Sequence, residues 1–158
     1  MKSLAVVIST HHDNTVKIGR AIADEIDAEL KAPKDVDENK ISEYDLIGFG
    51  SGIYSATVHD EVVSLVEKIS KVSNKDAFIF STAGVTSSSK LLKDHSQLRQ
   101  RLEEKGFYVV GEFQCKGFNT NSFLKFFGGM NKGRPNAEDL RNAQMFAQDV
   151  VEKYSKKA

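Results

Sequence analysis

The sequence of 158 residues contains one cysteine, two prolines and no tryptophan. A single cysteine cannot form an internal disulfide or build a thiolate metal site. The 22 basic and 22 acidic side chains cancel, which argues against a basic nucleic-acid-binding surface. No apolar run approaches the ~20 residues that span a membrane, and nothing ahead of Leu4 resembles a signal peptide. We therefore expect a cytoplasmic protein that binds neither nucleic acid nor membranes.

The rest of the composition is that of an ordinary globular domain. Hydrophobic residues make up 40% of the chain and charged residues 28%, which argues against a disordered polypeptide. The length matches one domain, and no linker or low-complexity tract interrupts the sequence. We therefore predict that residues 1–158 form a single domain.

Short apolar runs alternate with segments whose apolar residues have helical spacing. The runs predict strands at residues 4–8, 28–31, 46–50, 77–80 and 107–113. The helical spacings give apolar faces across residues 18–26, 62–69, 91–102 and 140–154. Thr57 and Asn136 are predicted to cap the second and the last of these helices. Such alternation predicts an α/β fold, with a parallel sheet covered by helices on both faces.

Polar segments follow three of the predicted strands. The carboxyl ends of parallel strands share one edge of a sheet, and ligands bind at that edge in such folds. The first segment comprises Ser9, Thr10, His11, His12, Asp13, Asn14 and Thr15. The second comprises Ser51, Gly52, Ile53, Tyr54 and Ser55, and the third comprises Ser81, Thr82, Ala83, Gly84 and Val85. We expect these segments to meet in one binding site.

The segment 9–15 has the composition of a phosphate-binding loop. It leads from a strand into a helix, whose N-terminus offers unpaired N–H groups and a partial positive charge. The hydroxyls of Ser9, Thr10 and Thr15 and the amide of Asn14 can add hydrogen bonds. Such residues also cap helices without binding a ligand, but a whole segment of them favours phosphate. The glycine patterns of dinucleotide and nucleoside triphosphate sites are absent from it.

Several segments of the chain resemble the flavodoxin family. Ser9-Thr10-x-x-x-Asn14-Thr15 and the helix after it are similar to the phosphate loop and first helix of flavodoxins. Residues 46–54 and 78–84 resemble the two segments that hold the flavin ring, and residues 132–139 resemble the entry to the last helix. The resemblance covers nearly the whole chain. It implies a single-domain doubly wound sheet of five parallel strands, in the order 2-1-3-4-5.

The resemblance also implies a function. Flavodoxins bind FMN and carry low-potential electrons between redox partner proteins, a reductase and an acceptor enzyme. The FMN phosphate would bind at residues 9–15, and the ring would lie between residues 51–55 and 81–85. Tyr54 is the candidate for stacking on the ring, although it could instead pack on the helix beneath. We assign no catalytic residue and no metal ligand, and we expect a monomer.

Two other functions occur on related folds. An NAD(P)H-dependent FMN or quinone reductase remains the alternative, although no pyridine-nucleotide site is evident. A response-regulator-like domain fits badly, because it needs an acidic pair after the first strand and a phosphorylatable aspartate after the third. Here the first segment offers only Asp13, and Gly50-Ser51-Gly52 stands at the second position.

His12 and Asp13 depart from the pattern of the family, which usually has a small or hydroxyl residue and then a glycine there. His12 could donate an imidazole N–H to a phosphate. A carboxylate beside a phosphate is repulsive. We therefore predict that the Asp13 side chain points to solvent, with only its N–H facing the ligand.

Three features outside the polar segments have a structural interpretation and a functional one. His95 lies on an apolar helix face and favours a core histidine over a ligand. Cys115 favours a small buried hydrophobe over a redox role. The segment 116–135 interleaves Phe118, Phe123, Phe126 and Phe127 with basic residues. That pattern favours a loop packed over the sheet end, ahead of a docking surface or flavin cover and of single-stranded nucleic-acid stacking.

Overall fold

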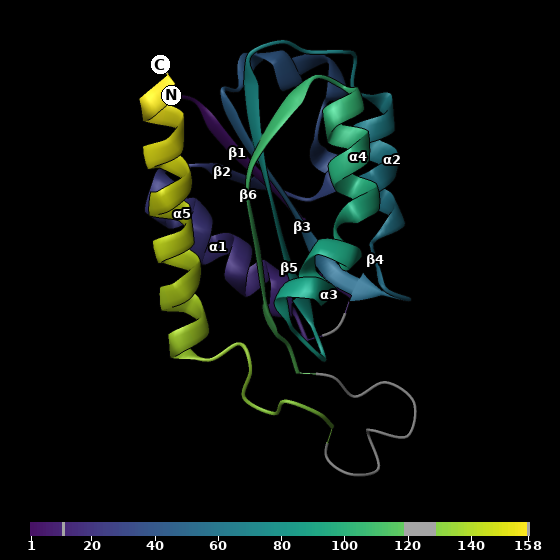
Figure 1. Cartoon of the computed structure of the whole chain (residues 1–158), viewed down its shortest axis with the longest axis vertical. Helices are drawn as coiled ribbons and strands as arrows, with labels where there is room; N and C mark the ends of the chain where they lie inside the picture. The colour runs from purple at the N-terminus through teal and green to yellow at the C-terminus, as the bar shows by residue number, and fades with distance from the viewer. Residues whose placement is uncertain (11, 119–128, 158) are drawn as a thin grey trace.

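The computed structural model describes residues 1–10, 12–118 and 129–157. Its centre is a sheet with five parallel strands (Figure 1). In spatial order they are β2 (Glu29–Lys31), β1 (Ser3–Ile8), β3 (Leu46–Tyr54), β5 (Lys75–Ala83) and β6 (Phe107–Lys116). A short strand, β4 (Thr57–Val58), pairs antiparallel with the end of β3. Counted without β4, the order is the predicted 2-1-3-4-5, so the predicted fold is confirmed.

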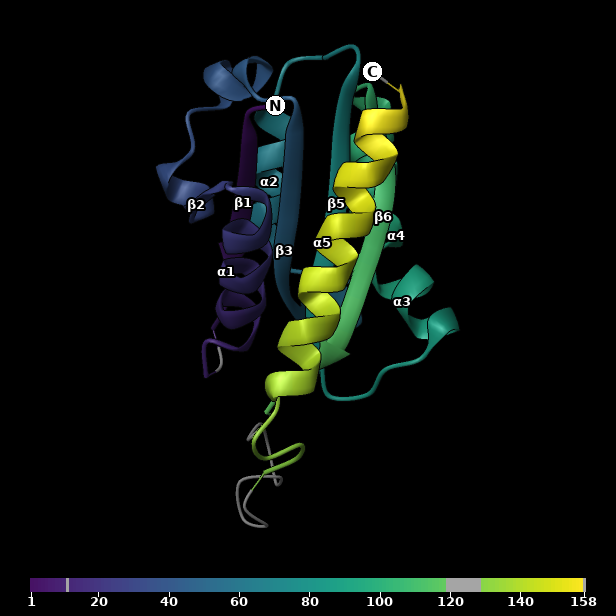
Figure 2. The ribbon, with the colours of Figure 1, turned by 90° about the vertical axis from the view of Figure 1, so that its left-hand side faces the viewer.

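Helices cover both faces of the sheet (Figures 1 and 2). On one face α1 (Asn14–Ile26) packs against α5 (Ala137–Lys157). On the other lie α2 (Asp60–Lys68) and α4 (Ser96–Glu104), with the short α3 (Ser88–Asp94) near the carboxyl end of the strands. Two turns of 3-10 helix, η1 (Pro33–Asp35) and η2 (Glu38–Glu43), connect β2 with β3. Among the helices described, none has the length and apolarity to cross a membrane.

Alternating side chains of the strands fill two cores, one on each face of the sheet. Phe78 and Phe80 belong to the core under α1 and α5, whereas Ile79 between them belongs to the core under α2 and α4. The Phe80 ring lies across the neighbouring strand, where a Cβ on Gly50 would come within 2.1 Å of it. The absence of a side chain at Gly50 therefore leaves room for the Phe80 ring. The apolar core thereby extends to the sheet edge where the polar segments begin.

The strands run further than the apolar runs predict. β3 continues to Tyr54 and β5 to Ala83, so most residues of the second and third polar segments are strand residues. The reason is pairing: Ile53 and Tyr54 bond to β4, and Ser51 and Gly52 pair with β5. The expected loops shrink to a tight turn at Ser55 and Ala56 and to the segment 84–87.

The helix ends also differ in part from prediction. The helix predicted across residues 91–102 is two helices, α3 and α4, that meet at His95. Thr57 lies in β4 and does not cap α2; instead Nδ1 of His59 accepts the N–H of Glu61 at 3.0 Å. The prediction for α5 is confirmed, because Oδ1 of Asn136 accepts the N–H of Asp139 at 3.0 Å.

Candidate functional site

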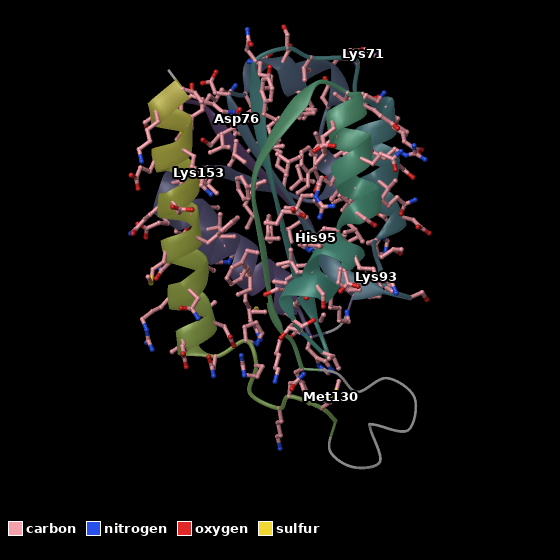
Figure 3. All side chains as sticks on the ribbon, in the orientation of Figure 1. Lys71, Asp76, Lys93, His95, Met130 and Lys153 are labelled. Carbon is pink, nitrogen blue, oxygen red and sulfur yellow. The ribbon has the colours of Figure 1, made fainter. Side chains whose placement is uncertain are left out.

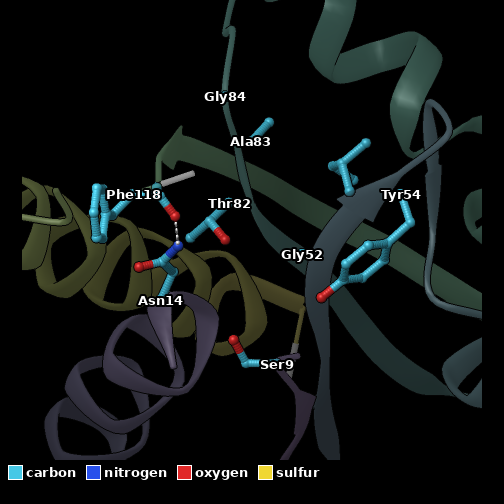
Figure 4. A pocket seen from close by; sticks show the side chains of 10 residues that line it. Ser9, Asn14, Gly52, Tyr54, Thr82, Ala83, Gly84 and Phe118 are labelled. Atoms are coloured by element: carbon cyan, nitrogen blue, oxygen red, sulfur yellow. Dashed lines mark hydrogen bonds between the residues drawn. The ribbon is translucent and has the colours of Figure 1, made fainter. Parts of the chain in front are cut away.

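A pocket lies at the carboxyl ends of β1, β3 and β5 (Figure 4). It is lined by Ser9, Asn14, Gly52, Ile53, Tyr54, Thr82, Ala83, Gly84, Gly117 and Phe118. The three polar segments predicted from the sequence thus meet in one place, and the chain that follows β6 adds a further wall. Apart from Gly117 and Phe118, every lining residue belongs to the predicted set.

The N-terminus of α1 forms one end of this pocket. The helix has no acidic side chain in its first turn, and its N-cap residue, Asp13, makes no side-chain capping bond to the residues described. The carbonyl of Asp13 accepts the N–H of Lys17 at 3.0 Å, which is the first bond of the helix. The N–H groups of the first turn therefore lack partners within the helix and are suited to an anion.

Asn14 and Thr15 are buried at the start of α1. Nδ2 of Asn14 donates to the carbonyl of Phe118 at 2.8 Å, which leaves its buried Oδ1 without a partner among the described residues. The hydroxyl of Thr15 is 2.8 Å from that of Thr82 on β5. Asn14 therefore lines the pocket and offers it a polar group, whereas Thr15 ties the helix to the sheet beneath.

His12 and Asp13 both have left-handed backbone, with φ of 54° and 52°. Both are exposed, and Asp13 lines a groove between α1 and α5, with Lys17 and Leu140, in place of the pocket. This position agrees with the prediction that the carboxylate avoids a ligand in the pocket. The ring of His12 lies against that of Phe118, with the ring centroids 4.4 Å apart. His11 falls outside the described residues.

Tyr54 connects the second polar segment to the first. Its hydroxyl accepts the N–H of Thr10 at 3.2 Å and the hydroxyl of Thr10 at 2.7 Å. Its ring meets that of His59 edge-on, with the centroids 5.3 Å apart. Tyr54 thus stands at the rim of the pocket beside the start of α2, and its position agrees with either of the two interpretations of its role.

Eight of the predicted site residues that the structure describes lie outside the pocket lining: Thr10, His12, Asp13, Thr15, Ser51, Ser55, Ser81 and Val85. The hydroxyl of Ser51 is buried and accepts the N–H of His59 at 3.0 Å, and that of Ser81 is buried beside His95. Ser55 and Val85 are exposed at the turns beyond the strands. Ser51 and Ser81 directly precede the pocket residues of their strands, and their hydroxyls bond to His59 and His95 instead.

Sequence reasoning missed the specific contribution of Gly117 and Phe118. A Cβ on Gly117 would lie 2.7 Å from Nδ2 of Asn14, so only glycine allows this close approach. Asn131 bonds to the same wall, because its Nδ2 donates to the carbonyl of Gly84 at 2.7 Å. The prediction that segment 116–135 packs over the sheet end as a loop did not single out these two residues. Phe123, Phe126 and Phe127 lie outside the described residues.

The other candidate groups are structural in the part of the chain that is described. Burial raises the pKa of Cys115 to about 12, so its thiol is protonated and inert at neutral pH. The described residues contain no cluster of three or more histidine, cysteine or carboxylate side chains that could hold a metal ion. Hydroxyl, amide, aromatic and main-chain groups line the pocket, and none of its ten lining residues has a charged side chain.

Comparison with known proteins assigns the family. Residues 5–149 match the flavodoxin domain, and the chain belongs to this family. An uncharacterized protein of Methanocaldococcus jannaschii is 46% identical over 151 residues, which cover 96% of this chain and 99% of the relative. The family therefore agrees with the resemblance carried by the three polar segments.

Solved structures confirm the fold. Oxidised flavodoxin 2 from Bacillus cereus matches with a TM-score of 0.72 and 18% identity, over 97% of this chain and 99% of that one. A flavodoxin from the domain Archaea matches with a TM-score of 0.70 and 19% identity, over 98% of this chain and 99% of that one. At these identities the structures establish a flavodoxin-like fold and nothing finer.

Proposed function

We propose that this chain binds FMN in the pocket and carries electrons between a reductase and an acceptor protein. The observation that carries the proposal is the meeting of an uncapped helix N-terminus with the polar ends of β3 and β5 in one pocket. Membership of the flavodoxin domain family, whose members usually bind FMN, supports it independently.

The phosphate would bind at the start of α1. The N–H groups of the first turn and the hydroxyl of Ser9 are the donors on offer there, because Nδ2 of Asn14 already donates to the carbonyl of Phe118. Thr10 donates its N–H to Tyr54, so a phosphate could use that group only after Tyr54 had moved. The site needs no lysine or arginine, because helix N–H groups and the helix dipole favour a monoester phosphate by themselves.

The flavin ring would lie between two strand ends. Gly52, Ile53 and Tyr54 form one side of the pocket, and Thr82, Ala83 and Gly84 form the other. FMN would supply the redox chemistry, while the protein would hold and orient it and set its electrostatic surroundings. No group on this chain has to donate or remove a proton for that role, which agrees with the uncharged lining.

A titration of the apoprotein with FMN tests the proposal. Binding is followed by quenching of flavin fluorescence, with riboflavin as the control ligand that lacks the phosphate. We expect FMN to bind at least about tenfold more tightly than riboflavin, because each hydrogen bond to a charged phosphate is worth about 1.5–3 kcal/mol. Absence of FMN uptake would overturn the proposal.

The same preparation separates a carrier from a reductase. We propose a monomeric carrier, which oxidises NADPH only when a separate reductase is added. Steady NADPH oxidation by the purified FMN-loaded protein alone would replace the carrier with the NAD(P)H-dependent reductase. Size-exclusion chromatography on the same sample tests the monomer.

A further inference from the structure

A buried chain of polar groups lies behind the pocket, on the face of the sheet covered by α4 (Figure 3 labels His95). His95, at the junction of α3 and α4, has no exposed surface. Its Nε2 is 2.7 Å from the hydroxyl of Ser81 on β5, and its Nδ1 is 3.2 Å from Oε1 of Glu112 on β6. The imidazole therefore bridges two strands from the point where the helix is broken.

The direction of these hydrogen bonds follows from Glu112. Burial would raise the pKa of Glu112, but hydrogen bonds from His95 and Arg99 outweigh burial and hold the pKa below its ordinary value. Nε and Nη2 of Arg99 donate to the two carboxylate oxygens at 2.9 and 2.6 Å. An ionised carboxylate only accepts, so Nδ1 of His95 carries the proton at this contact. That arrangement leaves Nε2 to accept the hydroxyl proton of Ser81 in the neutral ring.

The chain of contacts ends one residue away from the pocket lining. Ser81 directly precedes Thr82, Ala83 and Gly84, which form one wall of the pocket. Ser81 and Thr82 point to opposite faces of the sheet, where Ser81 bonds to His95 and Thr82 to Thr15 of α1. The end of β5 is therefore held from both faces.

The same contacts hold both ends of the segment that follows β5. Nε2 of Gln114 on β6 donates to the hydroxyl of Ser81 at 3.2 Å and to Oδ2 of Asp94 at 3.0 Å. Ser81 precedes residues 84–87, and Asp94 ends the short helix after them. His95, next to Asp94, closes the loop back onto Ser81. Hydrogen bonds are directional, so this set of contacts constrains the orientation of Ser81 and Asp94 as well as their distance.

We propose that His95 is a positioning residue that fixes the Thr82–Gly84 wall of the pocket through Ser81 and Glu112. This inference rests on the proposed function in so far as the wall contacts FMN. His95 does not touch the pocket itself. Its effect on FMN affinity and on the reduction potentials of bound FMN would therefore pass through the end of β5.

The test compares His95→Leu with Leu98→Ala in α4, a fully buried residue of the apolar core that makes no polar contact. We expect His95→Leu to weaken FMN binding at least about tenfold, the effect of losing one directional hydrogen bond of about 1.4 kcal/mol. Its potentials should shift as well. Leu98→Ala should lower the urea midpoint while leaving the FMN dissociation constant within about twofold. Equal effects of the two variants on FMN binding would overturn the inference.

Two additions keep the test decisive. Ser81→Ala removes the link to the wall with little change in volume, and it should reproduce the loss of affinity where His95→Leu fails to fold. Amide hydrogen exchange of the apoprotein should be faster at residues 82–84 in His95→Leu and unchanged there in Leu98→Ala. If the wild type takes up no FMN, the proposed function fails, and the exchange measurement alone then decides on the positioning role. Unchanged exchange at 82–84 in His95→Leu would overturn it.

Discussion

Two aspartates hold left-handed backbone at the two ends of α1. Asp13 precedes the helix and Asp27 follows it, each with φ of 52°. Such a conformation strains most residues with a side chain, whereas glycine adopts it freely. Asp13 stands next to the proposed phosphate site, and Asp27 is a helix length away. Substitutions at the two positions therefore distinguish the effect of relieving backbone strain from the effect of removing a charge near the phosphate.

Replacing Asp13 with glycine should strengthen FMN binding. Asp13→Gly relieves the strained backbone and removes a carboxylate from the phosphate segment, so we expect an affinity gain of about threefold at low salt. Asp27→Gly relieves the same strain far from the pocket and should leave the affinity unchanged. Fluorescence titrations of both variants make the comparison. Weaker binding by Asp13→Gly would show that the Asp13 side chain supports the ligand.

Tyr54 allows its ring and its hydroxyl to be tested separately. Tyr54→Phe keeps the ring and removes the acceptor that Thr10 uses, so FMN affinity should be equal or higher. Tyr54→Ala also removes the ring, and we expect about tenfold weaker binding because an aromatic contact contributes about 0.5–1.5 kcal/mol beyond its buried area. Titration with FMN measures both. If Tyr54→Ala binds FMN as the wild type does, the ring serves only to pack against His59.

At the scale of elements, the sequence predicts most strands and helices because their apolar residues keep a regular period. It underestimates the lengths of β3 and β5. The last residues of these strands lie outside the apolar runs, and they are strand residues because they pair with neighbouring strands. The break at His95 is equally hidden, because Leu91, Leu98 and Leu102 keep helical spacing across it. The break coincides with the polar contacts of His95 with Ser81 and Glu112, which join residues far apart in the chain.

The candidate site can be predicted because the strands can be. Polar segments that follow parallel strands must meet at one edge, so Ser9, Asn14 and Thr82 could be placed together from the sequence. The contribution of Gly117 and Phe118 could not, because it depends on how closely the chain after β6 approaches α1. The burial of Ser51 and Ser81 depends on strand ends that only pairing defines.

The last helix offers an element-scale test. Asn136 and Asp139 form a reciprocal capping pair at the start of α5: each side chain accepts the other's N–H, at 3.0 and 2.8 Å. Asn136→Ala should lower the free energy of unfolding by about 1 kcal/mol, because the first turn loses its cap. Asn142 is an exposed residue within the same helix, and Asn142→Ala should raise the free energy of unfolding by about 0.3 kcal/mol. Urea unfolding measures both, and equal stability of the two variants would contradict the capping role.

For the whole molecule, the two faces of the sheet hold the pocket in different ways. On one face α1 brings its N-terminus and Thr15 to the end of β5, through a bond between two hydroxyl groups. On the other, His95 at the α3–α4 junction bonds to Ser81 of the same strand and to Glu112 of β6, which Arg99 also contacts. The pocket is thus an edge shared by two cores, and one of its supports is charged.

Glu112 in that charged support and Asp139 near the start of α5 make the stability of the molecule depend on pH. Glu112 and Asp139 have pKa values below the ordinary 4.5 and 3.8. Burial would raise both values, but hydrogen bonds from His95 and Arg99 in the first case, and from Arg134 and the Asn136 backbone in the second, outweigh it. The unfolded chain therefore binds more protons than the folded one in acid. Their stabilisation is complete above the ordinary values and is lost as the pH falls through the lower, folded values.

Urea unfolding between about pH 7 and pH 3 should show this loss. Glu112→Gln should lower the free energy of unfolding at neutral pH, because Arg99 and His95 lose a charged partner. It should also make the fall in stability below the ordinary carboxyl pKa less steep, because one of the carboxyl groups with a lowered pKa is gone. Since Glu112 is only 15% exposed, the difference between the two curves should persist in about 0.5 M salt, where exposed pairs are screened. Parallel curves for wild type and variant would show that Glu112 titrates alike in the folded and unfolded chain, and that His95 lacks the ionised partner that orients it.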